Sequence, residues 1–169
     1  LLAHWQGHRA LTRRTIEAFP EKDLFSFSIG GMRTFAELAA IEYVQNKHNL
    51  LLAPIYAATR MLDKAGLTLQ DFDFYEIHEA FAAQVLATLK IWESAELSKT
   101  FGYDKPLGAI DRSKLNVKGS SLAAAHPFAA TGGRIIGVMA KLLNEKGSGR
   151  GFISVCAAGG QGITMIMEK

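Results

Sequence analysis

Apolar residues recur three and four positions apart in several stretches of the chain, which is the period of an amphipathic helix. Elsewhere they form short runs between turn residues, which is typical of buried strands. The first pattern predicts helices over residues 1–19, 34–44, 54–65, 79–92 and 131–145. The second predicts strands over residues 72–77, 152–156 and 163–167. Helices and strands therefore alternate through the second part of the chain.

Turn and cap residues mark the limits of these elements. Pro20 ends the first helix, and Thr34 is placed to cap the second with Glu37 three residues on. Gly66 and Gly147 follow the helices that end at residues 65 and 145, as helix-terminating glycines do. Three stretches between the elements are expected to lack helices. Residues 25–31 favour a loop, 94–115 an irregular polar segment, and 116–125 a tightly packed strand or loop.

The alternation predicts an α/β fold with helices layered on a sheet over residues 50–169. The polar stretch Asn46–Asn49 marks a break before it. We therefore expect two parts, a helical segment over residues 1–45 and an α/β domain over residues 46–169.

Composition narrows the class of protein. The chain has 169 residues, of which 49% are hydrophobic and 21% charged, as in a soluble globular domain. Its one cysteine, Cys156, rules out a disulfide framework and favours a reducing, cytoplasmic setting. No apolar run reaches the roughly 20 residues of a membrane span, and the first residues do not match a signal peptide. The net charge of +3 is spread out, so no nucleic-acid partner is predicted.

Three segments place a reactive side chain where a strand or helix meets a turn, which is where sites assemble in α/β folds. They contain His78 before a helix, His126 before Pro127, and Cys156 before a glycine turn. Each also has a structural interpretation. A single histidine at a helix start is commonly a cap, and a buried cysteine commonly packs as a small apolar residue. Glu79 is expected to complement the dipole of the helix that follows it.

In combination and in this order, the segments resemble the thiolase family, in the branch that carries His-Glu-Ala-Phe. The stretches that carry the resemblance are Tyr75–Gln84, Asn116–Gly133 and Cys156–Gly162, within residues 41–169. The resemblance implies the C-terminal half of the thiolase fold, a layered mixed sheet with helices, here preceded by a helical N-terminal segment. It also implies thiolytic cleavage or Claisen condensation of a 3-ketoacyl-CoA.

The resemblance implies a role for each residue. Cys156 would be the acid/base thiol, with a pKa lowered by a nearby charge or dipole. His126 would activate the nucleophile's thiol, and His78, where many relatives carry Asn, would hold a water or the substrate oxygen. Ala158 and Gly159 would supply a second oxyanion hole and Phe128 a substrate contact. The substrate is a coenzyme A thioester; no cofactor and no metal is expected.

Departures from the family pattern limit this interpretation. The family's acylated cysteine has no counterpart here, because Cys156 is the only cysteine, so the chain is expected to be inactive by itself. Ala125 stands where relatives have glycine, and Lys118 where a small amide residue is common. A single half would expose an apolar face, so we expect a homo-oligomer or pairing with another thiolase half.

Residues 1–40 are unlike the expected thiolase sequence and resemble the start of a DinB-like family, four-helix bundles that often bind metal. This interpretation predicts a fusion with its junction near residues 39–48; the alternative is a divergent helical appendage. Two other interpretations of the chain remain, a ketoacyl synthase and a non-catalytic remnant. The Cys156 hairpin favours a thiolase over a ketoacyl synthase. Acyl-chain preference and reaction direction are left open by the sequence.

Overall fold

The structure, a computed structural model, describes residues 51–169 in full and residues 40–45 as backbone. Four strands form one sheet: β1 Ala40–Gln45, β2 Phe74–Ile77, β3 Arg150–Ala157 and β4 Gln161–Glu168. The longer helices are α4 Ala53–Ala65, α5 Ala82–Glu93 and α8 Thr131–Lys146. Shorter helical turns are α6 Ala95–Thr100, η1 Arg112–Lys114 and α7 Ser121–Ala124.

The sheet is mixed, with strand order β1-β4-β3-β2. Strands β2 and β3 run parallel, with Ile77 opposite Ser154, so their carboxyl ends lie at the same edge of the sheet. Strands β3 and β4 form an antiparallel hairpin in which Cys156 faces Gly162, and β1 pairs antiparallel with β4. The predicted α/β class with a mixed sheet is confirmed.

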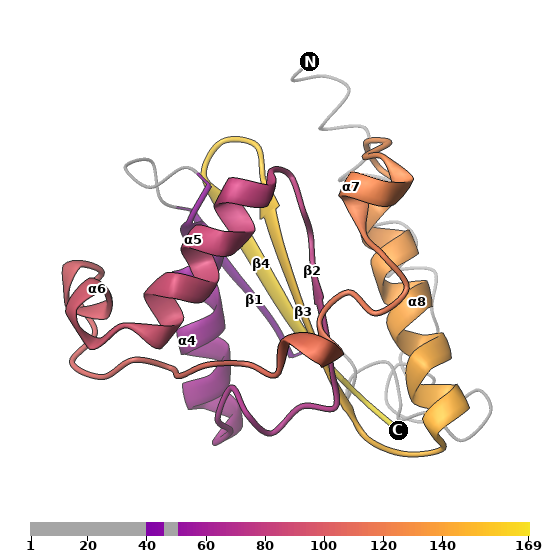
Figure 1. Cartoon of the computed structure of the whole chain (residues 1–169), viewed down its shortest axis with the longest axis horizontal. Coiled ribbons are helices and arrows are strands. Elements are labelled where there is room, and N and C mark those ends of the chain that lie inside the picture. Colours follow the sequence, from indigo (N-terminus) through magenta and orange to yellow (C-terminus); the bar gives the residue numbers. More distant parts are fainter. Residues whose placement is uncertain (1–39, 46–50) are drawn as a thin grey trace, which may run out of the picture.

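Helices cover both faces of the sheet (Figure 1). On one face, α4 and α5 bury Ile55, Leu62, Leu89 and Trp92 against Phe152 of β3 and its neighbours. On the other face, α8 packs against β3 and β4 through a smaller apolar cluster. That cluster contains Ile135, Met139, Leu143, Ile153 and Met167. Consecutive residues of β3 thus point to opposite layers, as strand geometry requires.

The helix limits follow the local signals in the sequence. Pro54 lies in the first turn of α4, and Gly66 ends this helix in the left-handed conformation, at φ 64°. Gly147 ends α8 in the same region, at φ 93°. Ile135 and Met139 of α8 are fully buried, as the helical spacing of apolar residues predicts.

Three local predictions are wrong. Residues 40–44, expected to continue a helix, form β1, because this stretch completes the ladder along β4. Residues 95–100, expected to be irregular, form α6, whose first turn is capped by the Ser94 hydroxyl accepting from Leu97 N–H at 3.2 Å. Residues 121–124, expected in a strand or loop, form α7. The remainder of the expected N-terminal segment, residues 1–39, lies outside the described residues.

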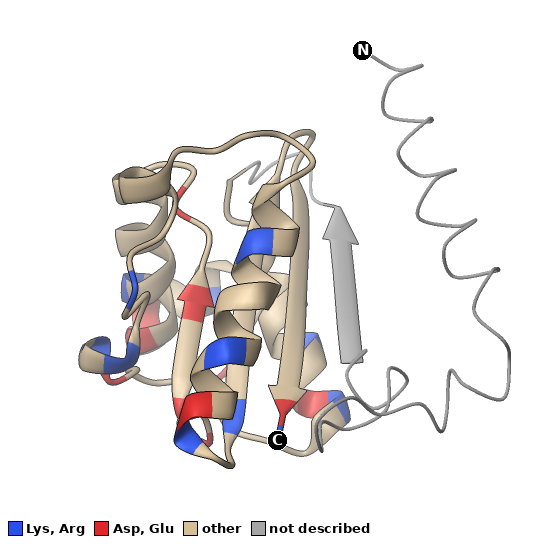
Figure 2. Cartoon of the chain, turned by 90° about the vertical axis from the view of Figure 1, so that its right-hand side faces the viewer, with Lys and Arg blue, Asp and Glu red and all other residues tan. Residues whose placement is uncertain are grey.

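Charged side chains are interspersed over the described part of the chain. In the view of Figure 2, basic and acidic segments lie close together along the same elements. Among the described residues, no helix combines the length and the apolar character that crossing a membrane requires.

Candidate functional site

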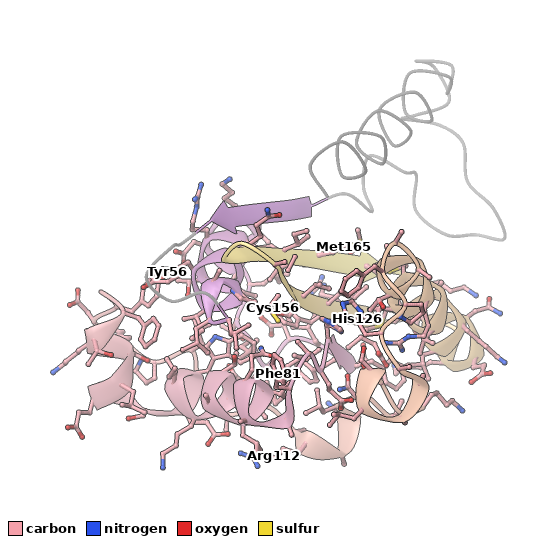
Figure 3. All side chains as sticks on the ribbon, turned by 90° about the horizontal axis from the view of Figure 1, so that it is seen from above. Tyr56, Phe81, Arg112, His126, Cys156 and Met165 are labelled. Atoms are coloured by element: carbon pink, nitrogen blue, oxygen red, sulfur yellow. The ribbon has the colours of Figure 1, made fainter. Side chains whose placement is uncertain are left out.

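The sheet edge at the carboxyl ends of β2 and β3 positions the predicted residues. His78 directly follows β2, and its backbone N–H donates to the Ser154 carbonyl of β3 at 2.8 Å. Cys156 lies two residues beyond Ser154, near the end of β3. Seen from above, the labelled side chains of Cys156, His126 and Phe81 lie around this end of the sheet (Figure 3). Chemistry at strand ends is the common arrangement in α/β folds.

The two imidazole rings meet. The ring centroids of His78 and His126 are 4.3 Å apart, with their planes tilted by 47°. His78 is only 1% exposed, and its Nδ1 lies 2.8 Å from the Ser121 hydroxyl of α7. Its other ring nitrogen, Nε2, is buried and has no hydrogen-bond partner among the described residues. A buried polar atom without a hydrogen-bond partner costs free energy, unless a ligand or a water molecule supplies the missing partner.

Burial also decides the charge of His78. Removal from water, reinforced by His126 and by the Arg134 guanidinium, lowers the pKa of His78 to about 4, against the opposing effect of Glu79. At neutral pH the ring therefore carries one proton. It can donate or accept through Nε2, depending on which nitrogen holds that proton.

His126 is held by the segment that starts α8. Its Nδ1 lies 2.6 Å from the Thr131 hydroxyl, and that hydroxyl donates to the Pro127 carbonyl at 3.3 Å. The Phe128 ring packs against the imidazole, with 4.9 Å between ring centroids and 61° between the ring planes. Phe128 itself is 83% exposed. An aromatic ring this exposed beside an imidazole is available to contact a bound molecule or another chain.

Glu79 supports the site in a way the sequence did not predict. Helix α5 begins at Ala82, and the Glu79 carboxylate instead accepts from Asn116 Nδ2 at 2.9 Å and from Leu122 N–H at 3.0 Å. The Asn116 side chain in turn accepts from Ile77 N–H at 2.8 Å and donates to the Ile77 carbonyl at 3.0 Å. Glu79 thus fastens the segment before His126 to the end of β2, and the expectation of a simple helix-dipole role is wrong.

The side chain of Cys156 lies on the opposite face of the sheet from the partners of the two histidines. Alternation along β3 places it on the side of Phe152 and Ser154, which α4 and α5 cover, whereas α7 and α8 carry the partners of the two histidines. It is 6% exposed, and this burial raises the pKa of its thiol. The expected lowering by a nearby charge or dipole is therefore not found among the described residues. Ala158 and Gly159 are exposed in the turn that follows.

Two titratable residues near His78, Glu76 of β2 and Arg134 of α8, were also missed by sequence reasoning. Glu76 of β2 is fully buried, and neither carboxylate oxygen has a hydrogen-bond partner among the described residues. Burial raises the pKa of Glu76 to about 7, against the attraction of Arg134 and with the help of Glu79. Arg134 of α8 donates through Nη2 to the hydroxyls of Ser121 and Ser120, at 3.0 and 3.4 Å. The only sequence signal was a carboxylate inside an apolar strand.

Among the described residues, no group of three or more histidine, cysteine, aspartate or glutamate side chains is placed to hold a metal ion. The expectations that Cys156, His126 and His78 are catalytic and that Ala158, Gly159 and Phe128 bind substrate remain predictions. The structure brings His78, His126 and Phe128 into contact and leaves Cys156 on the neighbouring strand end.

Most of this chain aligns with the sequences of known proteins. The 3-ketoacyl-CoA thiolase of Alteromonas mediterranea is 46% identical over 148 residues, 87% of this chain and 33% of that protein. The enzyme of the same name from Aliivibrio fischeri is 43% identical over the same shares. Among solved structures, the Bacillus anthracis acetyl-CoA acetyltransferase matches with a TM-score of 0.62 and 32% identity, covering 76% of this chain and 29% of that one. The chain thus spans about one third of its curated relatives.

The family described as "Thiolase, C-terminal domain" matches residues 32–169. This match, and an alignment over 148 residues, both begin ahead of residue 41. The junction expected near residues 39–48 is therefore wrong, and residues 32–40 belong with the sequence that follows. The fold, the order of the His78, His126 and Cys156 segments and these matches lead to one conclusion: the chain belongs to the thiolase family and carries its C-terminal domain.

Proposed function

We propose that this chain contributes the acid/base half of a thiolase site, for thiolytic cleavage or Claisen condensation of a 3-ketoacyl-CoA. The observation that supports it most is the pair of imidazole rings 4.3 Å apart at the carboxyl edge of β2 and β3. Two neighbouring imidazoles supply both a hydrogen-bond donor for a thioester oxygen and a base for a thiol. Cys156 at the end of β3 supplies the second thiol.

In the proposed reaction His126 takes the proton of a nucleophilic thiol, whose sulfur then attacks the ketone carbon of the 3-ketoacyl-CoA. The oxyanion that forms is held by hydrogen bonds at His78 and His126. When the carbon–carbon bond breaks, the electron pair passes to the α-carbon of the departing acetyl-CoA, which takes its proton from Cys156. Free coenzyme A then gives the proton of its thiol to the Cys156 thiolate and takes the acyl group from the nucleophilic sulfur. His126 returns its proton to that sulfur as it leaves.

The nucleophilic thiol must come from outside this sequence, because Cys156 is its only cysteine. We therefore expect no turnover by the chain alone. Activity requires a second thiolase half, from the same longer protein or from another chain. The exposed Phe128 and Leu122, on the segment that holds His126, belong to the surface such a half would cover. A reducing, cytoplasmic setting is part of this proposal, since both thiols must stay reduced.

The test is cleavage of acetoacetyl-CoA, followed by the loss of enolate absorbance. The purified chain is assayed alone and after co-expression with the N-terminal part of the Alteromonas mediterranea 3-ketoacyl-CoA thiolase, which is 46% identical to this chain over their shared region. We expect activity only in the combined sample. We also expect Cys156→Ala to lower it at least a hundredfold, in the usual range for a lost acid/base group.

A combined sample that assembles but stays inactive would favour the non-catalytic alternative. Turnover by the chain alone would contradict the requirement for a second thiol. Val155→Ala, a truncation on the neighbouring position of β3, serves as the matched control for Cys156→Ala, and activity should largely survive it.

A further inference from the structure

We propose that His78 and His126 are held in opposite tautomers, His78 with its proton on Nε2 and His126 with its proton on Nδ1. Arg134 is the positioning residue that fixes the first of these, acting through Ser121. The catalytic meaning of this arrangement rests on the proposed function, but the arrangement itself follows from the hydrogen bonds alone.

The tautomer of His78 follows from what surrounds the Ser121 hydroxyl. This hydroxyl is buried and has two neighbours, Arg134 Nη2 at 3.0 Å and His78 Nδ1 at 2.8 Å. A guanidinium can only donate, so Arg134 occupies a lone pair of the hydroxyl oxygen. The hydroxyl's own proton then needs an acceptor, because buried hydroxyls are almost always satisfied. His78 Nδ1 is the acceptor in reach among the described residues, so the proton of His78 lies on Nε2.

The tautomer of His126 follows from the opposite arrangement at Thr131. Here the hydroxyl donates to the Pro127 carbonyl at 3.3 Å, and a carbonyl oxygen can only accept. The Thr131 oxygen therefore presents a lone pair to His126 Nδ1, which lies 2.6 Å away. Nδ1 must carry the proton of His126 to make this hydrogen bond. The lone pair of His126 then lies on Nε2.

The two rings consequently offer nitrogens of opposite character. His78 presents an N–H at Nε2, which is buried and unpartnered in the described part of the chain. That N–H is a donor for a substrate oxygen or a bound water. His126 presents an acceptor at Nε2, which can take the proton of a thiol and leave the electron pair on sulfur. Two rings with the same tautomer would supply only one of these functions.

Because His78 is neutral, its tautomer decides whether Nε2 donates or accepts a hydrogen bond. With the pKa of His78 lowered to about 4, the ring holds a single proton at neutral pH. The groups that face this ring are His126, Arg134, Glu79 and Ser121. Of these, Arg134 and Ser121 make the contacts that choose between the two nitrogens.

The test is NMR of the uniformly 15N-labelled chain at pH about 8, above the ordinary titration range of imidazole. Long-range 1H–15N correlation spectra distinguish protonated from unprotonated ring nitrogens, and His78→Gln and His126→Asn assign the signals. We expect a protonated Nε2 for His78 and a protonated Nδ1 for His126. Identical tautomers, or the reverse pair, would overturn the inference without any variant being needed.

The part played by Arg134 is tested by Arg134→Met. This change removes the donor that orients the Ser121 hydroxyl. The hydroxyl proton can then turn away from His78, and His78 can donate from Nδ1 instead. We expect the Nδ1–H form of His78 to rise at least severalfold, while His126 keeps its tautomer. Arg134→Lys retains a donor and should restore the original form. Arg112→Met, at an exposed arginine paired with Glu93, is the matched control and should change neither ring.

An unchanged His78 spectrum in Arg134→Met would remove Arg134 from the inference. If that variant does not fold, Ser121→Ala replaces it, and His78 should again lose its single tautomer. The result is independent of turnover. Correct tautomers in a combined sample that assembles but stays inactive would contradict the proposed function alone, and wrong tautomers in an active one would contradict this inference alone.

Discussion

Gly162 of β4 lies against the backbone of Ala53, the first residue of α4, so closely that no side chain fits between them. A Cβ at Gly162 would overlap the Ala53 carbonyl group and the Pro54 nitrogen. Because Gly162 also faces Cys156 across the hairpin, this contact sets how α4 packs on the hairpin that carries the thiol.

We therefore expect Gly162→Ala to destabilise the chain by about 3 kcal/mol, as overpacking against rigid backbone does. The free energy of unfolding in urea measures it. Gly137→Ala in α8 is the control, because a Cβ there meets open space. It should be neutral or stabilising by up to about 1 kcal/mol. Equal effects of the two substitutions would contradict the close contact.

Ala125, immediately before His126, adopts φ 65° and ψ 179°, a region that essentially only glycine visits without strain. The alanine that departs from the family pattern is thus a strained residue. We expect Ala125→Gly to stabilise the chain by about 1 kcal/mol, the relieved strain less the added entropy of the unfolded state. Ala124→Gly, in the helical turn α7, should destabilise instead. Thermal unfolding of the two variants compares them; destabilisation by Ala125→Gly would contradict the strain.

Glu76 and His78 make opposite contributions to stability as pH changes. The pKa of Glu76 rises in the fold from 4.5 to about 7, so its contribution is full below pH 4.5 and is lost as pH rises through 7. The pKa of His78 falls from 6.5 to about 4, so its contribution is present above pH 6.5 and is lost as pH falls through 4. Between pH 4.5 and 6.5 the two slopes oppose each other.

The substitution Glu76→Gln should separate the pH-dependent contribution of His78 to stability from that of Glu76. We expect the variant to be more stable than the parent at pH 8 by up to about 3 kcal/mol, at 1.36 kcal/mol per pKa unit. Its stability should rise with pH from 4 to 6.5, where the parent changes little. Urea unfolding from pH 4 to 8 measures both. Glu96→Gln in α6 is the control, because an exposed carboxylate has similar surroundings in folded and unfolded chains. Parallel profiles for parent and Glu76→Gln would contradict the assignment.

The thiol of Cys156 should react slowly. Burial both raises its pKa and blocks access, so alkylation by iodoacetamide at pH 7.5 should be at least about tenfold slower in the folded chain than in urea. The single cysteine makes mass spectrometry an unambiguous measurement. A second half that supplies a charge or dipole should speed the reaction. Fast alkylation of the isolated folded chain would contradict the burial of the thiol.

Local signals in the sequence were enough for most of the elements. Pro54 and Gly66 bound α4, Gly147 ends α8, and the apolar spacing of Ile135 and Met139 gives the buried face of that helix. These features depend on neighbours within a few residues. The short helices α6 and α7 were missed because their stability comes from contacts with the rest of the chain and from a single serine cap, not from a long apolar pattern.

The sequence by itself determined the α/β class, which follows from the period of apolar residues, and the family, which follows from motifs in a fixed order. It also named His78, His126 and Cys156 as candidate site residues. Only the tertiary structure decided that the two imidazoles touch and that Glu79 fastens the segment before His126. It also decided that Glu76 is buried within reach of the Arg134 charge. These relationships join residues many positions apart, and hydrogen-bond direction, burial and charge act through space. The order of residues along the chain does not show such contacts.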